Sequence, residues 1–127
     1  MKHGLLVLAL LCAAGPACAR DAGLSPEFSA CMDQSNGVTA TMLACMSAET
    51  RRQDARLNQA YKAVMAQLSE ARQKELRDAQ RAWLKFREAN CRFYADPEGG
   101  TIATVNASDC LMSATAARAR ELEGFKR

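Results

Sequence analysis

Cysteine is the residue type in this sequence that is best suited to covalent chemistry. Four of the six cysteines lie beyond the first twenty residues, at Cys31, Cys45, Cys91 and Cys110. In a small exported chain, an even number of cysteines indicates disulfide bonds. The first two flank an Asn36-Gly37 turn, seven residues either side of Val38, and the last two flank a turn at 96–100 less symmetrically. The spacing favours the pairs Cys31–Cys45 and Cys91–Cys110 among three possible connectivities.

Two other uses of four thiols agree less well with this spacing. A structural zinc site normally contains closely spaced ligand pairs such as Cys-x-x-Cys, and the four cysteines form no such pair. Thiol–disulfide enzymes use the same short motif, so catalytic cysteines are also disfavoured. We therefore expect no metal ion and no cofactor.

Two arginines occupy positions where a helical pattern would place apolar side chains. Arg87 shares a line with Trp83, and Arg118 lies on the apolar line of the last predicted helix. A buried guanidinium needs an acceptor. The sequence predicts a buried or half-buried polar cluster, covered by Trp83 and Tyr61, that consists of Asp54, Asn58, Gln80, Arg87 and Arg118. We interpret it as a charge network that fixes helix register rather than as a ligand pocket, so removal of Asp54 should cost several kcal/mol.

Enzymatic chemistry finds little support in the sequence. The single histidine, His3, lies in the leader described below, so the remainder of the chain has no Ser-His or Cys-His nucleophile and no imidazole base. Carboxylates at Glu49, Glu88 and Asp109 could form an acid–base pair, but their spacing forces no two of them into one cleft. We expect a non-enzymatic protein without catalytic residues.

The first nineteen residues have the features of a secretory signal peptide. Lys2 precedes an apolar stretch at 4–14, and Ala17-Cys18-Ala19 forms an A-x-A cleavage site. The stretch is too short to span a bilayer as a stable helix, and neither leader cysteine lies in a bacterial lipobox. We expect cleavage after Ala19, a periplasmic or secreted product, and no stable membrane insertion.

The remaining residues, 20–127, are expected to form one domain. Removal of Lys2 lowers the net charge from +3 to +2, which gives no strong attraction for nucleic acid. One face of a predicted helix is basic and carries Lys74, Arg77, Arg81, Lys85 and Arg92. Acidic neighbours dilute this face, so a solvated surface explains it better than contact with an anionic polymer.

The hydrophobic spacing predicts helices throughout this domain. Ser25 and Pro26 suit the N-cap and first position of a short helix that ends near Gln34. Three longer helical patterns cover residues 39–68, 69–95 and 102–125. We expect an all-α fold, in which an antiparallel bundle of three main helices and a short N-terminal helix is stapled by two disulfides. Short connections should make sequential helices neighbours.

One extended motif joins these features. It runs Cys45…Asp54-x-x-Leu57-Asn58-x-x-Tyr61…Leu76-x-x-x-Gln80-x-x-Trp83-x-x-x-Arg87-x-x-x-Cys91…Gly99-Gly100-Thr101…Cys110…Arg118-x-x-x-Leu122. The motif resembles the LprI-like family of lysozyme inhibitors, which are small exported bacterial domains, and the resemblance covers about residues 31–122. It implies an α-helical, disulfide-bonded envelope domain, with lysozyme inhibition as the expected function.

A lysozyme inhibitor must block a cleft in which two carboxylates flank a sugar chain. The candidate partner-binding loop is polar, contains glycine and consists of Asp96, Glu98, Gly99, Gly100 and Thr101. A Cys91–Cys110 bond would hold both flanks and reduce the ordering cost of binding. Asp96 and Glu98 can pair with basic groups of a cationic lysozyme. The alternative interpretation is an ordinary turn between helices.

The sequence therefore predicts a monomeric binding protein that protects the cell wall by blocking a lysozyme or another wall hydrolase. The alternative is a structural or stress-related envelope module that binds a protein partner or an anionic envelope polymer. Because the net charge is slightly positive, attraction to a basic enzyme would have to come from a local acidic patch.

Overall fold

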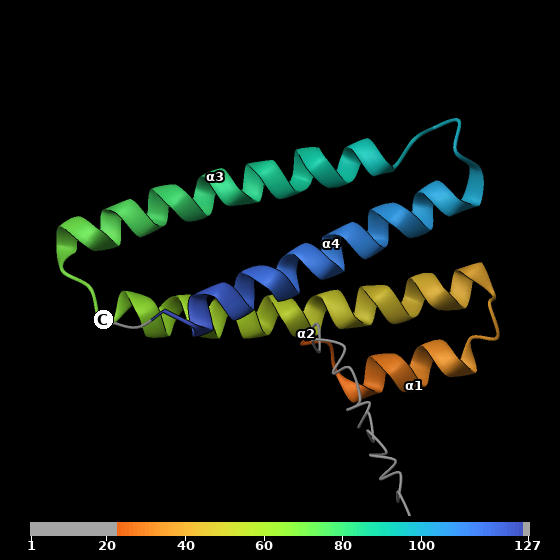
Figure 1. Cartoon of the computed structure of the whole chain (residues 1–127), viewed down its shortest axis with the longest axis horizontal. Helices are drawn as coiled ribbons and strands as arrows, with labels where there is room; N and C mark the ends of the chain where they lie inside the picture. Colours follow the sequence, from red (N-terminus) through yellow and green to blue (C-terminus); the bar gives the residue numbers. More distant parts are fainter. Residues whose placement is uncertain (1–22, 126–127) are drawn as a thin grey trace, which may run out of the picture.

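The computed structural model describes residues 23–125, so the expected signal peptide and its cleavage site lie outside the described residues. Along the chain, the helices are α1 (Pro26–Gln34), α2 (Thr39–Met65), α3 (Glu70–Tyr94) and α4 (Gly100–Glu123). No strand occurs in the described range, which confirms the predicted all-α fold (Figure 1). None of the described helices is both long and apolar enough to cross a membrane.

Capping residues set the helix boundaries. The Oγ of Ser25 accepts a hydrogen bond from the Phe28 N–H at 3.2 Å, and Pro26 begins α1, which confirms the predicted start. Helix α2 ends three residues earlier than predicted. The side-chain amide of Gln73 donates to the carbonyls of Met65 and Leu68, at 3.1 and 3.2 Å, and so satisfies acceptors that would otherwise favour another helical turn.

Helix α4 lies between α2 and α3 (Figure 1), and its contact with α2 is the most extensive in the fold. The buried core is formed by side chains of α2 and α4, which are Leu57, Ala60, Val64, Ala119 and Leu122. Trp83 and Tyr61 are partly buried against it. Two alanines in this set allow α2 and α4 to approach closely.

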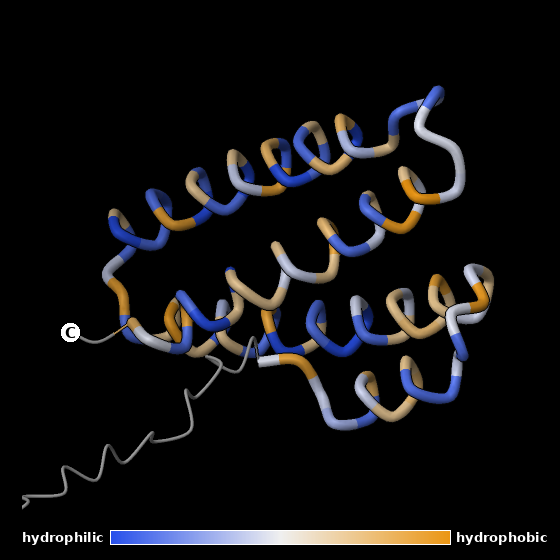
Figure 2. The backbone as a smooth tube through the Cα atoms, turned by 45° about the vertical axis from the view of Figure 1, so that its right-hand side comes forward, coloured by the Kyte–Doolittle hydropathy of each residue, from blue (hydrophilic) through white to orange (hydrophobic). Residues whose placement is uncertain are grey.

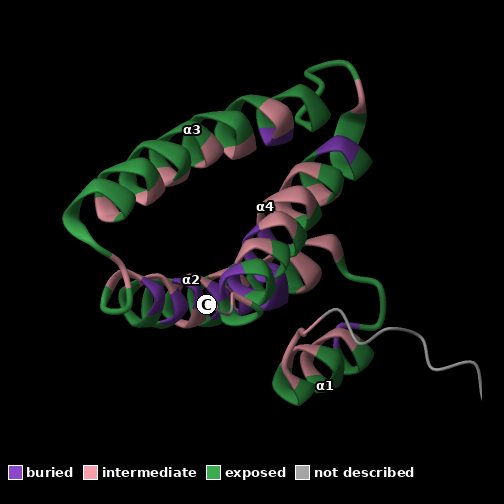
Figure 3. Ribbon diagram, turned by 60° about the vertical axis from the view of Figure 1, so that its left-hand side comes forward, coloured by how far each residue is buried: buried purple, intermediate pink, exposed green. Residues whose placement is uncertain are grey.

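The expectation that sequential helices pack as neighbours is wrong for α2 and α3. Helix α3 contacts α4 more than α2, and Cys91 is its one buried residue. The physical reason is the composition of its inner line, where Gln80 and Arg87 have long polar side chains that reach across to acceptors instead of interlocking with apolar neighbours. Figure 3 shows α3 exposed along its outer side.

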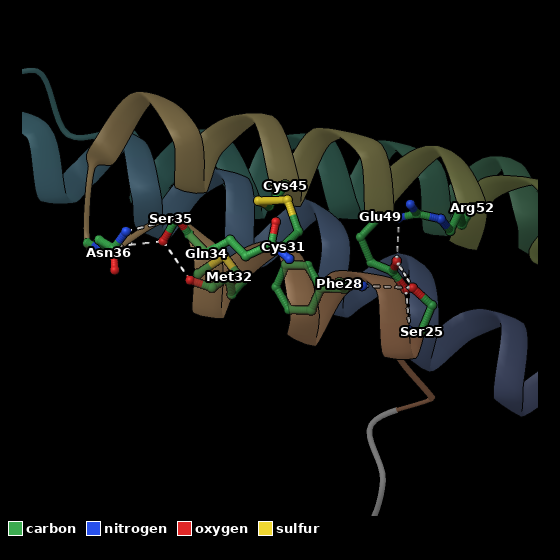
Figure 4. The surroundings of a disulfide bond; sticks show 11 residues. Ser25, Phe28, Cys31, Met32, Gln34, Ser35, Asn36, Cys45, Glu49 and Arg52 are labelled. Atoms are coloured by element: carbon green, nitrogen blue, oxygen red, sulfur yellow. Dashed lines mark hydrogen bonds and ion pairs between the residues drawn. A yellow bond between two sulfur atoms is a disulfide. The ribbon is translucent and has the colours of Figure 1, made fainter.

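The structure confirms both predicted disulfides. Cys31–Cys45 joins α1 to α2, and Cys91–Cys110 joins α3 to α4. No residue within Pro26–Gln34 is buried, so α1 is attached to α2 by the disulfide and by polar contacts more than by an apolar core. Figure 4 shows this attachment, with Ser25 and Glu49 at one end of α1 and Ser35 at the other.

Candidate functional site

A buried carboxylate is the centre of the polar structure at the start of the domain. Glu49 on α2 is fully buried, with 0% of its surface exposed. One carboxylate oxygen accepts hydrogen bonds from the Ser25 backbone N–H and the Gln53 amide, both at 2.7 Å. The other accepts from the Ser25 hydroxyl at 2.5 Å and from Arg52 at 2.9 Å (Figure 4). These contacts fasten the start of α1 to α2.

The surroundings of Glu49 stabilise its ionised form. Burial alone would raise the pKa of this carboxyl, because a charge loses its hydration in the interior. The hydrogen bonds from Ser25, Gln53 and Arg52 outweigh burial and hold the pKa of Glu49 below its ordinary value. The carboxylate is buried and both of its oxygens accept hydrogen bonds, so the group has a structural role in holding α1 on α2.

The same network continues to the end of the domain. The Gln53 amide and the Arg56 guanidinium both donate to the Gly23 carbonyl, at 2.9 and 3.0 Å. Arg56 also binds both carboxylate oxygens of Glu123, at 2.6 and 2.5 Å. This bidentate pair lowers the pKa of Glu123, chiefly through the hydrogen bonds from Arg56. Residue 23, α2 and α4 are thus tied together by polar groups.

This network was not predicted from the sequence, in which Glu49 was a candidate only for an acid–base pair. A signal was nevertheless present, because Glu49, Gln53 and Leu57 follow one another at intervals of four and therefore share one face of α2. The structure places all three among the buried residues. A polar pair on an otherwise apolar line predicts a buried hydrogen-bonded site.

The predicted cluster around the inward arginines divides into two neighbouring groups. Arg87 donates to the Thr115 hydroxyl at 2.9 Å and lies 3.4 Å from an Asp54 oxygen. Arg118 donates to the Gln80 side chain at 3.0 Å. Both guanidinium carbons lie over the Trp83 ring, at 5.1 and 5.9 Å from its centroid.

One residue expected in this cluster, Asn58, is more exposed than the sequence suggested, whereas Asp54 is half-buried. Asn58 is exposed, and 47% of the Asp54 side chain is accessible. Both lie at the edge of a shallow pocket of about 300 Å³ between α2 and α3, together with Tyr61. They remain open to water because α3 packs on α4 and leaves this flank of α2 uncovered. Thr115, which was not anticipated, is the buried partner of Arg87.

These exposures reverse the expected importance of Asp54. Asp54→Ala should lower the free energy of unfolding by less than about 1 kcal/mol, because the Asp54 carboxylate is half exposed and hydrated, and Arg87 keeps its hydrogen bond to Thr115. Arg87→Ala should cost about 2 kcal/mol, since it removes the partner of buried Thr115 and the contact with Trp83. Urea unfolding of both variants tests the difference, and an Asp54 variant at least as unstable as the Arg87 variant would contradict it.

The predicted partner-binding loop is shorter than the sequence suggested. Gly100 and Thr101 belong to the first turn of α4, and Gly100 has a φ of +65°, which favours glycine. Asp96 and Glu98 are exposed, and an Asp96 side-chain oxygen accepts from the Glu98 N–H at 2.9 Å. Apolar side chains surround this turn, with 46% of Tyr94 and 61% of Ile102 exposed.

We define the tip as Tyr94, Asp96, Pro97, Glu98 and Ile102. Except for Glu98, these residues line part of a pocket of about 470 Å³. The Cys91–Cys110 disulfide lies behind them and joins the two helices that the tip connects. The tip is therefore a braced projection that presents two carboxylates beside apolar side chains.

The other surface groups considered from the sequence do not converge on a site. The basic residues of α3 are exposed, and Asp78 lies among them, 2.9 Å from Lys74 and 3.9 Å from Arg81. Glu88 and Asp109 are exposed on different helices, whereas Glu49 is buried against α1. The structure brings none of these three carboxylates together as an acid–base pair.

Comparison with known proteins identifies one family. The chain matches the family described as lysozyme inhibitor LprI over residues 31–122, which is well over half of its length. No curated protein and no solved structure matches it significantly. The match includes all four disulfide cysteines and both inward arginines. The chain therefore belongs to the LprI lysozyme inhibitor family.

Proposed function

We propose that this protein is an exported, non-enzymatic inhibitor of a lysozyme or a related wall hydrolase. The observation that carries the proposal is the family match over residues 31–122. Two disulfides support export, because such bonds persist in oxidising compartments. The buried side chains of Glu49, Gln53 and Thr115 form hydrogen bonds within the domain, so function is assigned to an exposed surface.

The tip is the surface proposed to bind the enzyme. A cleft that binds a sugar chain presents apolar faces and the carboxylates of the catalytic pair. Tyr94 and Ile102 can fill apolar space in such a cleft, while Asp96 and Glu98 can pair with basic groups at its rim. Asp96 and Glu98 supply the local negative charge that the chain as a whole lacks.

Rigidity is the second requirement for an inhibitor that occupies a cleft. Ordering a flexible loop on binding would reduce affinity by its lost conformational entropy. Here the Asp96–Glu98 hydrogen bond closes the turn, and the disulfide fixes the two helices on either side. The tip therefore needs little further ordering.

Inhibition by the tip predicts a specific loss of activity. Ile102→Glu should raise the inhibitory concentration at least about tenfold, because a charge replaces an apolar contact in the centre of the interface. The assay is lysis of cell-wall material by several lysozyme classes, with the oxidised protein added in increasing amounts. Val38→Glu is the control, since Val38 is 55% exposed and lies at the α1–α2 turn, outside the pocket that the tip lines.

The two parts of the proposal fail differently. Absence of inhibition by the unchanged protein, with both disulfides intact, would refute the proposed function. Inhibition that survives Ile102→Glu unchanged would refute the assignment to the tip while leaving the function in place. An equal loss of inhibition in the Ile102→Glu and Val38→Glu variants would also contradict a role specific to the tip.

A further inference from the structure

A polar groove lies between α3 and α4, next to the Cys91–Cys110 disulfide. It has a volume of about 530 Å³, and apart from Cys110 and Ala114 it is lined by hydrogen-bonding side chains. These are Asn90, Tyr94, Asn106, Asp109 and Ser113. We call these five residues the α3–α4 groove. None of them belongs to the Glu49 network or to the contacts of the inward arginines.

Helix geometry brings the five side chains together. Asn90 and Tyr94 are four residues apart and share one face of α3. Asn106, Asp109 and Ser113 follow one another at intervals of three and four, so they share one face of α4. Figure 2 shows the two helices running side by side toward the turn that joins them. The disulfide between them fixes their separation here, with the Cα atoms of its two cysteines 5.4 Å apart.

The polar groups of the α3–α4 groove make only weak contacts with one another. The Asn90 amide donates to the Cys110 sulfur at 3.6 Å, and sulfur is a weak acceptor. The Ser113 hydroxyl lies 3.4 Å from an Asp109 oxygen, which is long for a hydrogen bond between two oxygens. The Asn106 side chain is exposed at the groove. A ligand with its own hydroxyl and amide groups can replace these weak contacts with stronger ones.

The chemistry of the lining distinguishes between classes of ligand. Among the described residues, no basic side chain lines the α3–α4 groove, so a phosphate or carboxylate would meet no counter-charge. A wholly apolar ligand would leave the Asp109 carboxylate without hydration. An amide both donates and accepts hydrogen bonds, so Asn90 and Asn106 match the hydroxyl and acetamido groups of a saccharide. Tyr94 is 46% exposed, and its ring offers an apolar face for the C–H side of a sugar ring.

The shape of the hollow indicates an extended ligand. Tyr94 and Asn106 also line the pocket of about 470 Å³ beside the tip, so the α3–α4 groove adjoins that pocket. A ligand made of linked units can occupy both hollows, whereas a single small molecule would occupy one. A chain of sugar rings has this form.

We propose that the α3–α4 groove binds an uncharged, N-acetylated oligosaccharide. The two asparagine amides pair with acetamido groups, Asp109 and Ser113 bind hydroxyl groups, and one sugar ring packs on Tyr94. The braced helices reduce the ordering cost of binding. The proposal does not depend on the proposed function, because saccharide binding is measured without any hydrolase and can fail or succeed separately from inhibition.

Titration of the oxidised protein with the tetramer of N-acetylglucosamine, followed by amide NMR spectra, tests the groove. The side-chain amide signals of Asn90 and Asn106 should shift and reach saturation. The signal of Asn58 should not move, because this asparagine is exposed on α2 outside the groove. The absence of shifts at Asn90 and Asn106 with millimolar saccharide would overturn the proposal, as would shifts of equal size at Asn58.

A pair of matched variants locates the binding site. Asn106→Leu should raise the Kd for the tetramer at least about tenfold, because an apolar side chain leaves polar groups of the saccharide without a partner. Asn58→Leu makes the same exchange at an exposed asparagine of α2 and should leave the Kd unchanged. Both positions are exposed, so helical circular dichroism should be the same in both variants. Equal Kd values for the two variants would overturn the assignment to the groove.

A charged analogue tests whether the ligand is neutral. Removing the acetyl groups from the same tetramer leaves free amino groups, which are protonated in mildly acidic buffer. This form should bind more weakly, because it lacks the acetamido groups that pair with Asn90 and Asn106. Tighter binding of the cationic form, lost in Asp109→Asn, would show that the carboxylate binds an amine and would overturn the neutral saccharide.

Discussion

Replacing Glu49 with alanine is expected to lower the free energy of unfolding by about 3 kcal/mol, one of the two largest effects anticipated for this protein. The carboxylate is fully buried and receives donors from Ser25, Gln53 and Arg52. Alanine would leave the buried Gln53 amide without one acceptor and would open a cavity beside the start of α1. Urea unfolding with both disulfides intact measures the loss.

A matched variant separates this effect from the general loss of a glutamate. Glu88 is exposed in the C-terminal half of α3, and Glu88→Ala should change the unfolding free energy by less than about 0.5 kcal/mol. Equal stability of the two variants would show that the Glu49 network contributes little. Limited proteolysis provides a second measurement, because the Glu49 variant should be cut near Ser25 before the rest of the domain opens.

The same group makes stability depend on pH in a defined direction. The folded state lowers the pKa of Glu49, so the unfolded chain takes up a proton more readily. The stabilisation is therefore complete above the ordinary glutamate value of 4.5 and is lost as the pH falls through the lower folded pKa. Glu49→Gln, which cannot titrate, should lose less stability over that acid range than the unchanged protein.

Removing the Cys91–Cys110 bond by a double exchange to serine should cost about 3 kcal/mol, the second large effect. The bond spans 19 positions in sequence and joins the two helices that carry the tip. Without it, the unfolded chain gains conformational freedom and the tip loses its brace. Urea unfolding and the wall-lysis assay should therefore both report a loss in this variant.

The other disulfide provides the control. Cys31–Cys45 spans 14 positions, so its removal should reduce stability by a similar amount. It joins α1 to α2 and is remote in sequence from the tip, so inhibition should persist wherever the domain remains folded. If the two double variants lost inhibition in parallel with stability, the Cys91–Cys110 bond would have no special role in presenting the tip.

Local signals in the sequence were sufficient to predict the helices and the disulfide pairs. Ser25 followed by Pro26 predicted the start of α1 because capping depends on a few adjacent residues. Cys31 and Cys45 were paired correctly because they flank one turn, seven residues either side of Val38. Both inferences used contacts between residues near one another in the chain.

Contacts between distant residues were predicted less well. Hydrophobic spacing showed which face of each helix is buried but not which helix covers it, so the preference of α3 for α4 was missed. Asn58 was consequently placed in a buried or half-buried cluster, although it is exposed on an open flank of α2. Thr115 could not be identified as the partner of Arg87, because a threonine within a helix resembles many surface residues.

The pairing of α2 with α4 affects when the domain can fold. Leu57, Ala60 and Val64 acquire their apolar neighbours from Ala119 and Leu122, which are about sixty residues later in the chain. Contacts of such long sequence separation form slowly, because a large loop must close first. During synthesis, the apolar face of α2 stays uncovered until the last helix has emerged, so the polypeptide remains unfolded until it is nearly complete.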